Sequence, residues 1–252
     1  MQFRLRYLWL LLWTIPLGFV SCKKEKPTIN NYPPLTLYPV KESKSYLFVN
    51  NQIVDSVIFK LSFDQQDRLI SQWSLKENLV LELDYSNAGM VKMLQKNKST
   101  DSINFLFEYR LNYQGYTANR NTFGINGVLL QTNSYLYNSE GHKIKEYLKS
   151  SNDSSLIFSG IWDGPNLIHY EYPSNEHLVE VKYTQIADLR NLGFYHFTGD
   201  RSYYLIQEEN VKSRGVNSLY EYTYVFDSSK RPKEVIVTRN GEKYLEKHYQ
   251  YW

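Results

Sequence analysis

The sequence holds a single cysteine, Cys22, in 252 residues. One cysteine cannot form a disulfide within the chain, so the stability of any folded domain must come from its core and its hydrogen bonds. The same scarcity excludes a zinc site built from several thiolates. Thiol catalysis is excluded as well, because the residues around Cys22 give it a different role.

Sequence motifs of the common catalytic families are also missing. The chain contains no Gly-x-Ser-x-Gly, no phosphate-binding loop, no Gly-x-Gly-x-x-Gly and no His-Glu-x-x-His. Of the five histidines, His169 lies two positions from Glu171 on one strand face, where the pair could start a metal or acid/base site, but it has no third partner at useful spacing. We therefore expect a protein that is not an enzyme, with no catalytic residues, no metal and no cofactor.

The chain lacks a strong charge of either sign. Its 29 Lys and Arg against 26 Asp and Glu give a net charge of +3. This balance argues against the basic surface that nucleic acids need, so we expect no nucleic-acid partner. Hydrophobic residues make up 42% and aromatics 16%, with 23 tyrosines, which excludes a disordered chain and favours half-buried β-strands.

Long apolar runs are confined to the first 22 residues. Arg4 and Arg6 precede an apolar stretch over residues 8–20, and Ser21 is a small residue directly before Cys22. This is the layout of an export signal that is removed on maturation. An uncleaved membrane helix is an alternative, although this run is shorter than the ~20 residues that span a bilayer.

The motif Phe19-Val20-Ser21-Cys22 resembles the lipobox of bacterial lipoproteins. The lysine-rich residues 23–26 resemble the start of mature lipoproteins from the Bacteroidota. The resemblance implies that residues 1–21 are a signal peptide and that Cys22 carries the lipid, with palmitate among its acyl chains. It also implies a lipid-anchored protein of the cell envelope, at the outer membrane, so that the membrane is its first partner. An ordinary secretory signal with a coincidental cysteine is the alternative.

Residues 22–43 are expected to form the lipidated N-terminus and a tether. They contain half of the eight prolines, namely Pro27, Pro33, Pro34 and Pro39, and show no periodicity. Such a segment is extended and semi-rigid, and it spaces a domain from its anchor. An irregular loop packed on the domain is the alternative. Residues 44–252 remain as one domain.

Alternation of apolar and polar residues dominates this domain. Six apolar or aromatic residues occupy successive odd positions at Ile103, Phe105, Phe107, Tyr109, Leu111 and Tyr113. One apolar face per strand is typical of antiparallel sheets. Turn signals such as Asn126-Gly127 and Asn240-Gly241 separate the strands. The pattern predicts an all-β fold, a single long antiparallel β-meander, and the same alternation places Trp73 in the core with Leu69 and Leu75.

One segment breaks the strand pattern. Ile186, Leu189 and Leu192 have helical spacing, and Gly193 follows them as a stop signal. The sequence therefore predicts at most one short helix, or else an irregular excursion, over residues 186–192.

A seven-residue pattern recurs where strands end: an aromatic residue, a turn, then an apolar residue or proline. The copies lie at residues 63–69, 85–91, 137–143, 172–178 and 226–232, and each is expected to be a hairpin corner. The corners resemble the Tyr-Asp repeats of RHS-type proteins. With the lipoprotein signal, the chain is more similar to Bacteroidota lipoproteins of unknown function, which implies a meander curled into a half-barrel or porin-like sheet. Any β-meander with well-formed turns would show the same pattern.

These features favour a non-catalytic binding, adhesion or structural role in the cell envelope. Glycan capture by exposed aromatic residues is the alternative, with Trp162 in a turn and Tyr204 beside Tyr203 as the binding residues. An enzyme acting on envelope polymers is a further alternative, since two carboxylates on distant strands leave no local motif. A glycan or an envelope protein stays open as the partner, and the oligomeric state stays open too.

Overall fold

A computed structural model describes residues 37–149, 153–192, 195–199 and 201–252. The predicted signal peptide, Cys22 and most of the predicted tether lie outside these residues. The strands are β1 (Tyr38–Val49), β2 (Gln52–Phe63), β3 (Leu69–Ser74), β4 (Leu79–Asn87), β5 (Met90–Asn97), β6 (Ile103–Leu111), β7 (Thr117–Phe123), β8 (Leu129–Tyr137), β9 (Lys143–Lys149), β10 (Ser154–Asp163), β11 (Asn166–Tyr172), β12 (His177–Ala187), β13 (Arg190–Asn191), β14 (Tyr204–Ser213), β15 (Val216–Phe226), β16 (Pro232–Arg239) and β17 (Glu242–Tyr251). A 3-10 turn, η1 (Pro173–Asn175), and a helix, α1 (Tyr195–Thr198), are the described helical elements.

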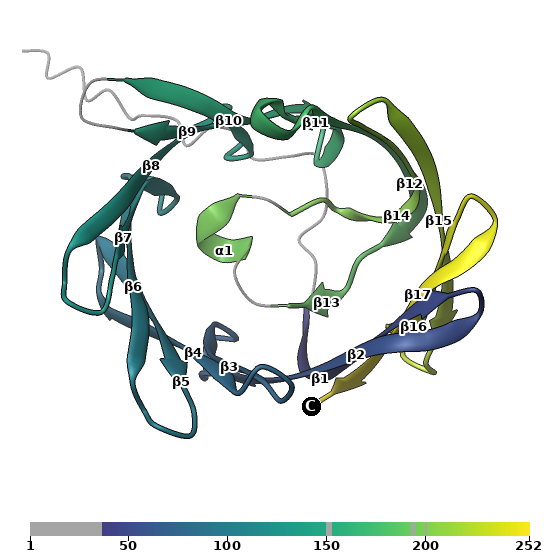
Figure 1. The fold of residues 1–252 in the computed structure, drawn as a ribbon, viewed down its shortest axis with the longest axis horizontal. Helices are drawn as coiled ribbons and strands as arrows, with labels where there is room; N and C mark the ends of the chain where they lie inside the picture. Colours follow the sequence, from purple (N-terminus) through teal and green to yellow (C-terminus); the bar gives the residue numbers. More distant parts are fainter. Residues whose placement is uncertain (1–36, 150–152, 193–194, 200) are drawn as a thin grey trace, which may run out of the picture.

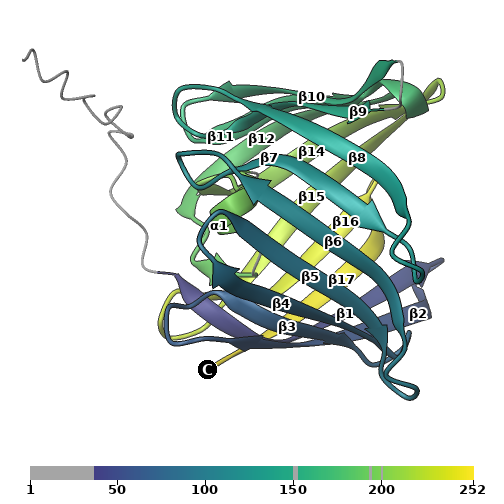
Figure 2. The ribbon, with the colours of Figure 1, turned by 90° about the vertical axis from the view of Figure 1, so that its left-hand side faces the viewer.

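Apart from β13, the described strands form one closed antiparallel barrel of sixteen strands (Figures 1 and 2). Each barrel strand pairs with the next along the chain, and β1 pairs with both β2 and β17. Ser45 of β1 thus lies between Val57 and Lys247. The all-β antiparallel prediction is confirmed, but the half-barrel is corrected to a closed barrel. Closure pairs the first strand with the last, which leaves neither of them as an open sheet edge.

The barrel starts earlier in the chain than the alternation indicated. β1 begins at Tyr38, inside the residues 22–43 that were assigned to the tether. Val40 is fully buried, so the C-terminal part of that range belongs to the barrel. Proline content obscured this strand, because Pro39 lies in it, and there it takes part in the short parallel pairing with β13.

The described residues of the segment 188–203, between β12 and β14, lie inside the barrel, and Figure 1 shows β13 and α1 inside the ring of strands. These described residues are called the plug segment below. Of the two alternatives for residues 186–192, the structure shows the irregular excursion and not the helix: β12 continues to Ala187, and α1 starts at Tyr195. Segments this short take their structure from tertiary contacts, here with the barrel wall, and not from helical spacing.

The two ends of the barrel differ. The turns at residues 64–68, 112–116, 138–142 and 227–231 lie at the end that the plug segment enters, where β1 begins and β17 ends. We call this the plugged end and the opposite end the mouth.

The rings of the plug segment identify the inner face of the strands. Phe197 is 1% exposed, and its ring lies 5.1 Å from the ring of Tyr109 and 6.4 Å from that of Tyr85. Thr117 donates a hydrogen bond to the carbonyl of Phe197 at 2.8 Å. Side chains alternate along a strand, so the neighbours of Tyr109 on β6, such as Glu108, face outward.

A hydrophobic core fills the plugged half of the lumen. It joins inward residues of strands from opposite parts of the barrel wall with Phe197, and its buried members include Val40, Leu61, Leu69, Leu83, Val91, Val235 and Val237. Burying side chains of this size stabilises the fold by about 1.5–3 kcal/mol each. The plug segment is therefore part of the folded core.

Trp73 lies on the outer face, which corrects its predicted place in the core. Phe63 pairs with Leu69 but Ser62 pairs with Ser71, so β3 has an extra residue at Ile70. Such a bulge moves all later side chains to the other face. Leu69 is buried inside, whereas the Trp73 ring faces outward beneath the Lys98 ammonium, 2.8 Å from the ring centroid.

Four corners at the plugged end share one hydrogen-bond pattern. Asp64, Asn112, Asn138 and Asp227 each accept backbone N–H bonds from the residues two and four positions later, at 2.9–3.1 Å. These Asx turns account for the repeats at 63–69, 137–143 and 226–232. The copy at 172–178 lies at the mouth instead and is built on η1.

Candidate functional site

The mouth half of the lumen is lined by inward side chains that remain accessible. Phe105 follows Phe107 and Tyr109 on the same face of β6 and is 37% exposed. Val216 shares a face with Tyr222 and is 60% exposed. This contrasts with the filled plugged half. The barrel thus has an apolar inner surface that the chain itself leaves uncovered.

A deep pocket of about 280 Å³ lies against the inner faces of β10, β11, β12 and β14. Its aromatic lining comes from Phe158, Tyr170, Tyr172 and Tyr183, and its aliphatic lining from Leu167, Val181 and Ile206. Lys143, Glu209 and Ser202 of the plug segment add polar atoms. Mostly apolar walls with a few polar groups are typical of small-molecule sites, and the size is at the lower end of their range.

Glu209 is the half-buried polar centre of this pocket. Its carboxylate accepts a hydrogen bond from the Tyr170 hydroxyl at 3.3 Å and another from the Tyr222 hydroxyl. Burial raises the pKa of both tyrosines far above the ordinary value, and the Glu209 charge raises each further. The phenols therefore stay protonated and act as donors.

Tyr183 connects the barrel wall to the plug segment. Its hydroxyl donates to the carbonyl of Leu167 at 2.9 Å and lies 2.8 Å from the Ser202 hydroxyl. Burial raises the pKa of Tyr183 to about 12. The pocket floor is thereby held at a fixed position.

A second polar cluster lies beside this pocket, on the inner faces of β7, β8 and β9. Glu146 accepts a hydrogen bond from Asn133 at 2.8 Å and lies 3.3 Å from the Lys143 ammonium and 3.9 Å from the Arg120 guanidinium. The Lys143 ammonium is also 4.6 Å from the ring centroid of Phe158. Both cations of this cluster thus share one carboxylate.

Lys247 is an inward cation on β17, between Leu245 and Tyr249 on the same face. Among the described residues it has no ion-pair partner within 4.0 Å. Burial lowers the pKa of Lys247, the Arg190 charge lowers it further, and Glu209 partly offsets this. Arg190 itself is paired with Asp188 at 2.8 Å, whereas Lys247 has no described carboxylate within 4.0 Å. Arg239, an inward cation near the mouth, also lacks a described ion pair and donates a hydrogen bond to the Ser218 hydroxyl at 3.1 Å instead.

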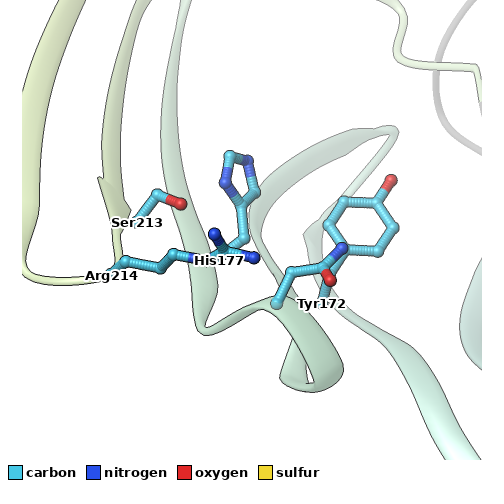
Figure 3. A pocket seen from close by; sticks show the side chains of 5 residues that line it. Tyr172, His177, Ser213 and Arg214 are labelled. Carbon is cyan, nitrogen blue, oxygen red and sulfur yellow. The ribbon is translucent and has the colours of Figure 1, made fainter.

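A rim pocket of about 460 Å³ lies at the mouth, and Figure 3 shows its side chains. Tyr172 is opposite His177, which is opposite Ser213 on the next strand, and the rings of Tyr172 and His177 are 5.9 Å apart. Arg214 extends from the adjacent turn. Tyr172 lines this pocket and the deep pocket, so the mouth and the deep pocket share one wall.

The structure does not bring the two aromatic residues predicted for glycan capture into these pockets. Trp162 ends β10 at the plugged end, donates to the carbonyl of Lys143 at 2.9 Å and stacks on His142 at 4.2 Å. Tyr204 starts β14 at the same end, with its ring 4.9 Å from that of Tyr203. Neither ring is among the described residues that line the deep or rim pocket. Their role in glycan binding stays a prediction.

His169 and Glu171 face outward from β11, opposite Glu180 and Leu178 of β12. Within the described ranges, no group of three or more His, Cys, Asp or Glu side chains is placed to hold a metal ion. Cys22, the predicted lipid site, lies outside the described residues.

No helix among the described residues is both long enough and apolar enough to cross a membrane.

Sequence reasoning missed Glu209 and Lys247. The available signal was a charged residue at a position where the strand's alternation calls for an apolar one. Lys247 lies between Leu245 and Tyr249 in such a series, and Glu209 precedes Val211 by two. Such residues are costly to bury without a partner, which makes them candidates for a functional site.

Comparison with known proteins finds solved structures of the same fold but identifies no family for this chain. No family model matches the sequence, and no curated protein is similar to it. A porin-like protein from Bacteroides uniformis superposes with a TM-score of 0.58 at 15% identity, over 87% of this chain and 98% of that chain. A porin-like protein from Bacteroides vulgatus gives a TM-score of 0.55 at 10% identity, over 85% and 99%. At these identities the likeness shows the fold alone.

Proposed function

We propose that this protein is a lipid-anchored protein of the cell envelope whose barrel binds a ligand in the mouth half of its lumen, without catalysis. One observation carries the proposal: the polarity of the barrel wall. Cross-strand ion pairs lie on the outer face, while mostly apolar and aromatic side chains, with a few charged groups, line a lumen that a core fills at one end and leaves accessible at the other.

The outer face carries cross-strand ion pairs. Lys96 lies 2.7 Å from Glu82, and Lys182 lies 2.8 Å from Glu208. Barrels that span a bilayer carry an apolar band on this face instead. An outer face of this kind suits water, and the apolar inner face then suits a bound molecule. The two Bacteroides proteins described as porin-like share the shape, and their name fits an envelope location.

The position of the N-terminus supports the anchor. β1 starts at the plugged end, so a lipid on Cys22 would hold this end toward the membrane and turn the mouth away from it. Leu37 lies fifteen positions after Cys22 (37 − 22), a distance of at most about 50 Å for an extended chain. The membrane is therefore the first proposed partner.

The anchor is tested in cells with a clickable palmitate analogue. We expect the full-length chain to take up label and sediment with membranes, and Cys22→Ala to lose both. Unlabelled wild-type protein, or full membrane retention of the variant, would contradict the anchor.

The lumen site is tested by thermal shift on residues 22–252 carrying Cys22→Ala, against oligosaccharides, amphiphiles and envelope fragments. A ligand that binds the native state raises the melting temperature. Val211→Arg places a long side chain in the lumen, and Asn210→Arg places the same side chain outside. We expect the ligand to raise the melting temperature of Asn210→Arg but not that of Val211→Arg. No shift with any class, or equal shifts in both variants, would overturn a ligand site in the lumen.

A further inference from the structure

The inner surface of the mouth half combines accessible apolar side chains with Lys247, an inward cation that has no described ion-pair partner within 4.0 Å. Its accessible apolar members are Val57, Phe105, Val211 and Val216, and none of them is fully buried. They lie on β2, β6, β14 and β15, so the accessible apolar surface covers separate parts of the wall. Accessible apolar side chains inside the barrel offer a binding surface to an apolar group.

Lys247 defines the inner limit of this surface. It follows Leu245 on the inner face, and Val57 lies two strands away in the same row, with Ser45 between them. Beyond Lys247 lie Tyr249 and Arg190, which are joined by a hydrogen bond of 2.8 Å at the plug segment. A ligand entering from the mouth therefore passes Arg239, which is bonded to Ser218, and accessible apolar side chains before it reaches the ammonium.

The charges around Lys247 favour an anion. Asp188 already pairs with Arg190, and Glu209 is occupied by two tyrosine hydroxyls. No described carboxylate lies within 4.0 Å of Lys247 to act as its counter-ion. A carboxylate or phosphate oxygen at the Lys247 ammonium would supply that counter-charge and gain a charge-assisted hydrogen bond.

We propose that the lumen binds an amphipathic anion, with its carboxylate or phosphate group at Lys247 and its apolar chain against the mouth half. This rests on the proposed ligand-binding function and specifies its ligand class. Lys247 lies five positions after Glu242 at the mouth (247 − 242), about 16 Å along the strand. At the usual strand tilt this is about 12 Å along the barrel axis, which is the length available to the apolar chain.

The experiment measures binding of dodecanoate, dodecyl phosphate and dodecanol to residues 22–252 carrying Cys22→Ala, by titration calorimetry below their micelle concentrations. The two anions separate the possible head groups, and the alcohol reports the apolar chain alone. We expect the protein to bind at least one anion more tightly than the alcohol.

Lys247→Met removes the charge and keeps the length of the side chain. It is expected to weaken anion binding about tenfold or more, the usual scale for a charge-assisted contact, and to leave dodecanol unchanged. Lys247→Arg restores a cation and should restore anion binding. Lys44→Met removes a lysine from the outer face of β1 and serves as the matched control.

Val216→Asn changes the mouth at an exposed position and should weaken all three probes. Leu219→Asn makes a similar change on the outer face of β15 and should weaken none. Anion binding that Lys247→Met leaves unchanged would overturn the proposal, as would binding of none of the three probes. A different outcome is that an oligosaccharide raises the melting temperature of the protein and of Asn210→Arg but not of Val211→Arg. In that case the lumen still binds a ligand, and only the ligand class proposed here is wrong.

Discussion

The ring of Phe197 meets the ring of Tyr109 edge-on, with their centroids 5.1 Å apart. Phe197 belongs to the plug segment and Tyr109 to β6, so the contact joins parts of the chain that are far apart in sequence. The Phe197 carbonyl is also held by Thr117 at 2.8 Å. The plug segment is thus fixed by both a ring contact and a hydrogen bond.

Phe197→Ala should destabilise the barrel by about 3–5 kcal/mol, because a buried aromatic ring is replaced by a cavity. Chemical denaturation followed by circular dichroism measures the loss. Ile161→Ala, at a residue that is 55% exposed on β10, is the control and should change stability by no more than about 0.5 kcal/mol. Equal losses in both variants would mean that the plug segment does not contribute to the core.

Two corner glycines offer a matched pair. Gly141 and Gly115 both have a positive φ, +85° and +87°, which strains any other residue. A Cβ at Gly141 would lie 2.4 Å from the Tyr116 ring, whereas at Gly115 it would meet nothing within 4 Å. The Tyr116 ring stacks on the Tyr137 ring, with centroids 5.2 Å apart, which restricts the movement that would relieve this clash.

We therefore expect Gly115→Ala to cost only the backbone strain, about 1–2 kcal/mol, and Gly141→Ala to cost clearly more. Melting temperatures of the two variants give the difference directly. A Gly141→Ala protein as stable as Gly115→Ala would show that Tyr116 moves aside freely.

The sequence predicts the strands of this barrel better than its closure. The odd-numbered series around Tyr109 gave both the strand β6 and its inner face, because alternation is a local property. The pairing of Ser43 with Tyr249 that closes the barrel joins residues 206 positions apart (249 − 43) and leaves no local signal. An open half-barrel and a closed one therefore have the same pattern.

Two further misses have specific physical causes. The bulge at Ile70 reversed the faces of the rest of β3, and periodicity read across it put Trp73 on the wrong side. The apolar residues near Leu189 are compatible with a helix face and equally with an irregular segment inside the lumen. Contacts with the surrounding barrel determine which of the two forms. Lys247 stood out as a charge in an apolar series, but its place in the lumen required the closed fold.

Asp227 stabilises its corner through a charged carboxylate. Its Oδ1 accepts the N–H groups of Ser229 and Arg231, and its Oδ2 accepts the Arg231 side chain at 2.7 Å. Burial alone would raise the pKa of Asp227, but the hydrogen bonds from Arg231 lower it below the ordinary value of 3.8. The ionised form is therefore favoured in the folded state.

Asp227→Asn should keep the turn, since Asn138 holds the same position in another corner, and lose only the ion pair. Asp227→Ala should lose the turn as well and cost about 1–3 kcal/mol. A depressed pKa stabilises the fold above the unfolded pKa, and this stability is lost as the pH falls through the folded value. Melting temperatures of wild type and Asp227→Asn should thus converge below about pH 4 and differ above it. A difference in melting temperature that stays constant from neutral pH to below about pH 4 would contradict the lowered pKa of Asp227.

The tyrosines of the lumen predict a loss of stability at high pH, the opposite of the loss at low pH expected from Asp227. Burial raises the pKa values of Tyr170, Tyr222 and Tyr224 well above the ordinary value of 10.0, and it raises that of Tyr183 to about 12. A raised tyrosine pKa contributes stability that is complete below the unfolded pKa, and this stability is lost as the pH rises toward the folded value. The barrel should therefore lose stability progressively above about pH 10.

Phenolate absorbance tests this directly. At about pH 11 the native protein should show clearly less phenolate than the same protein in concentrated urea, where every tyrosine titrates near its ordinary value. Tyr222→Phe removes one of the shielded hydroxyls. It should reduce the difference in phenolate absorbance between the native and the urea-unfolded protein by the contribution of one tyrosine. Because the Tyr222 hydroxyl also donates to Glu209, this variant should cost about 1.5–3 kcal/mol as well. Full phenolate absorbance with native circular dichroism at that pH would mean that water reaches the tyrosines, and that the inner wall around Glu209 is open rather than packed.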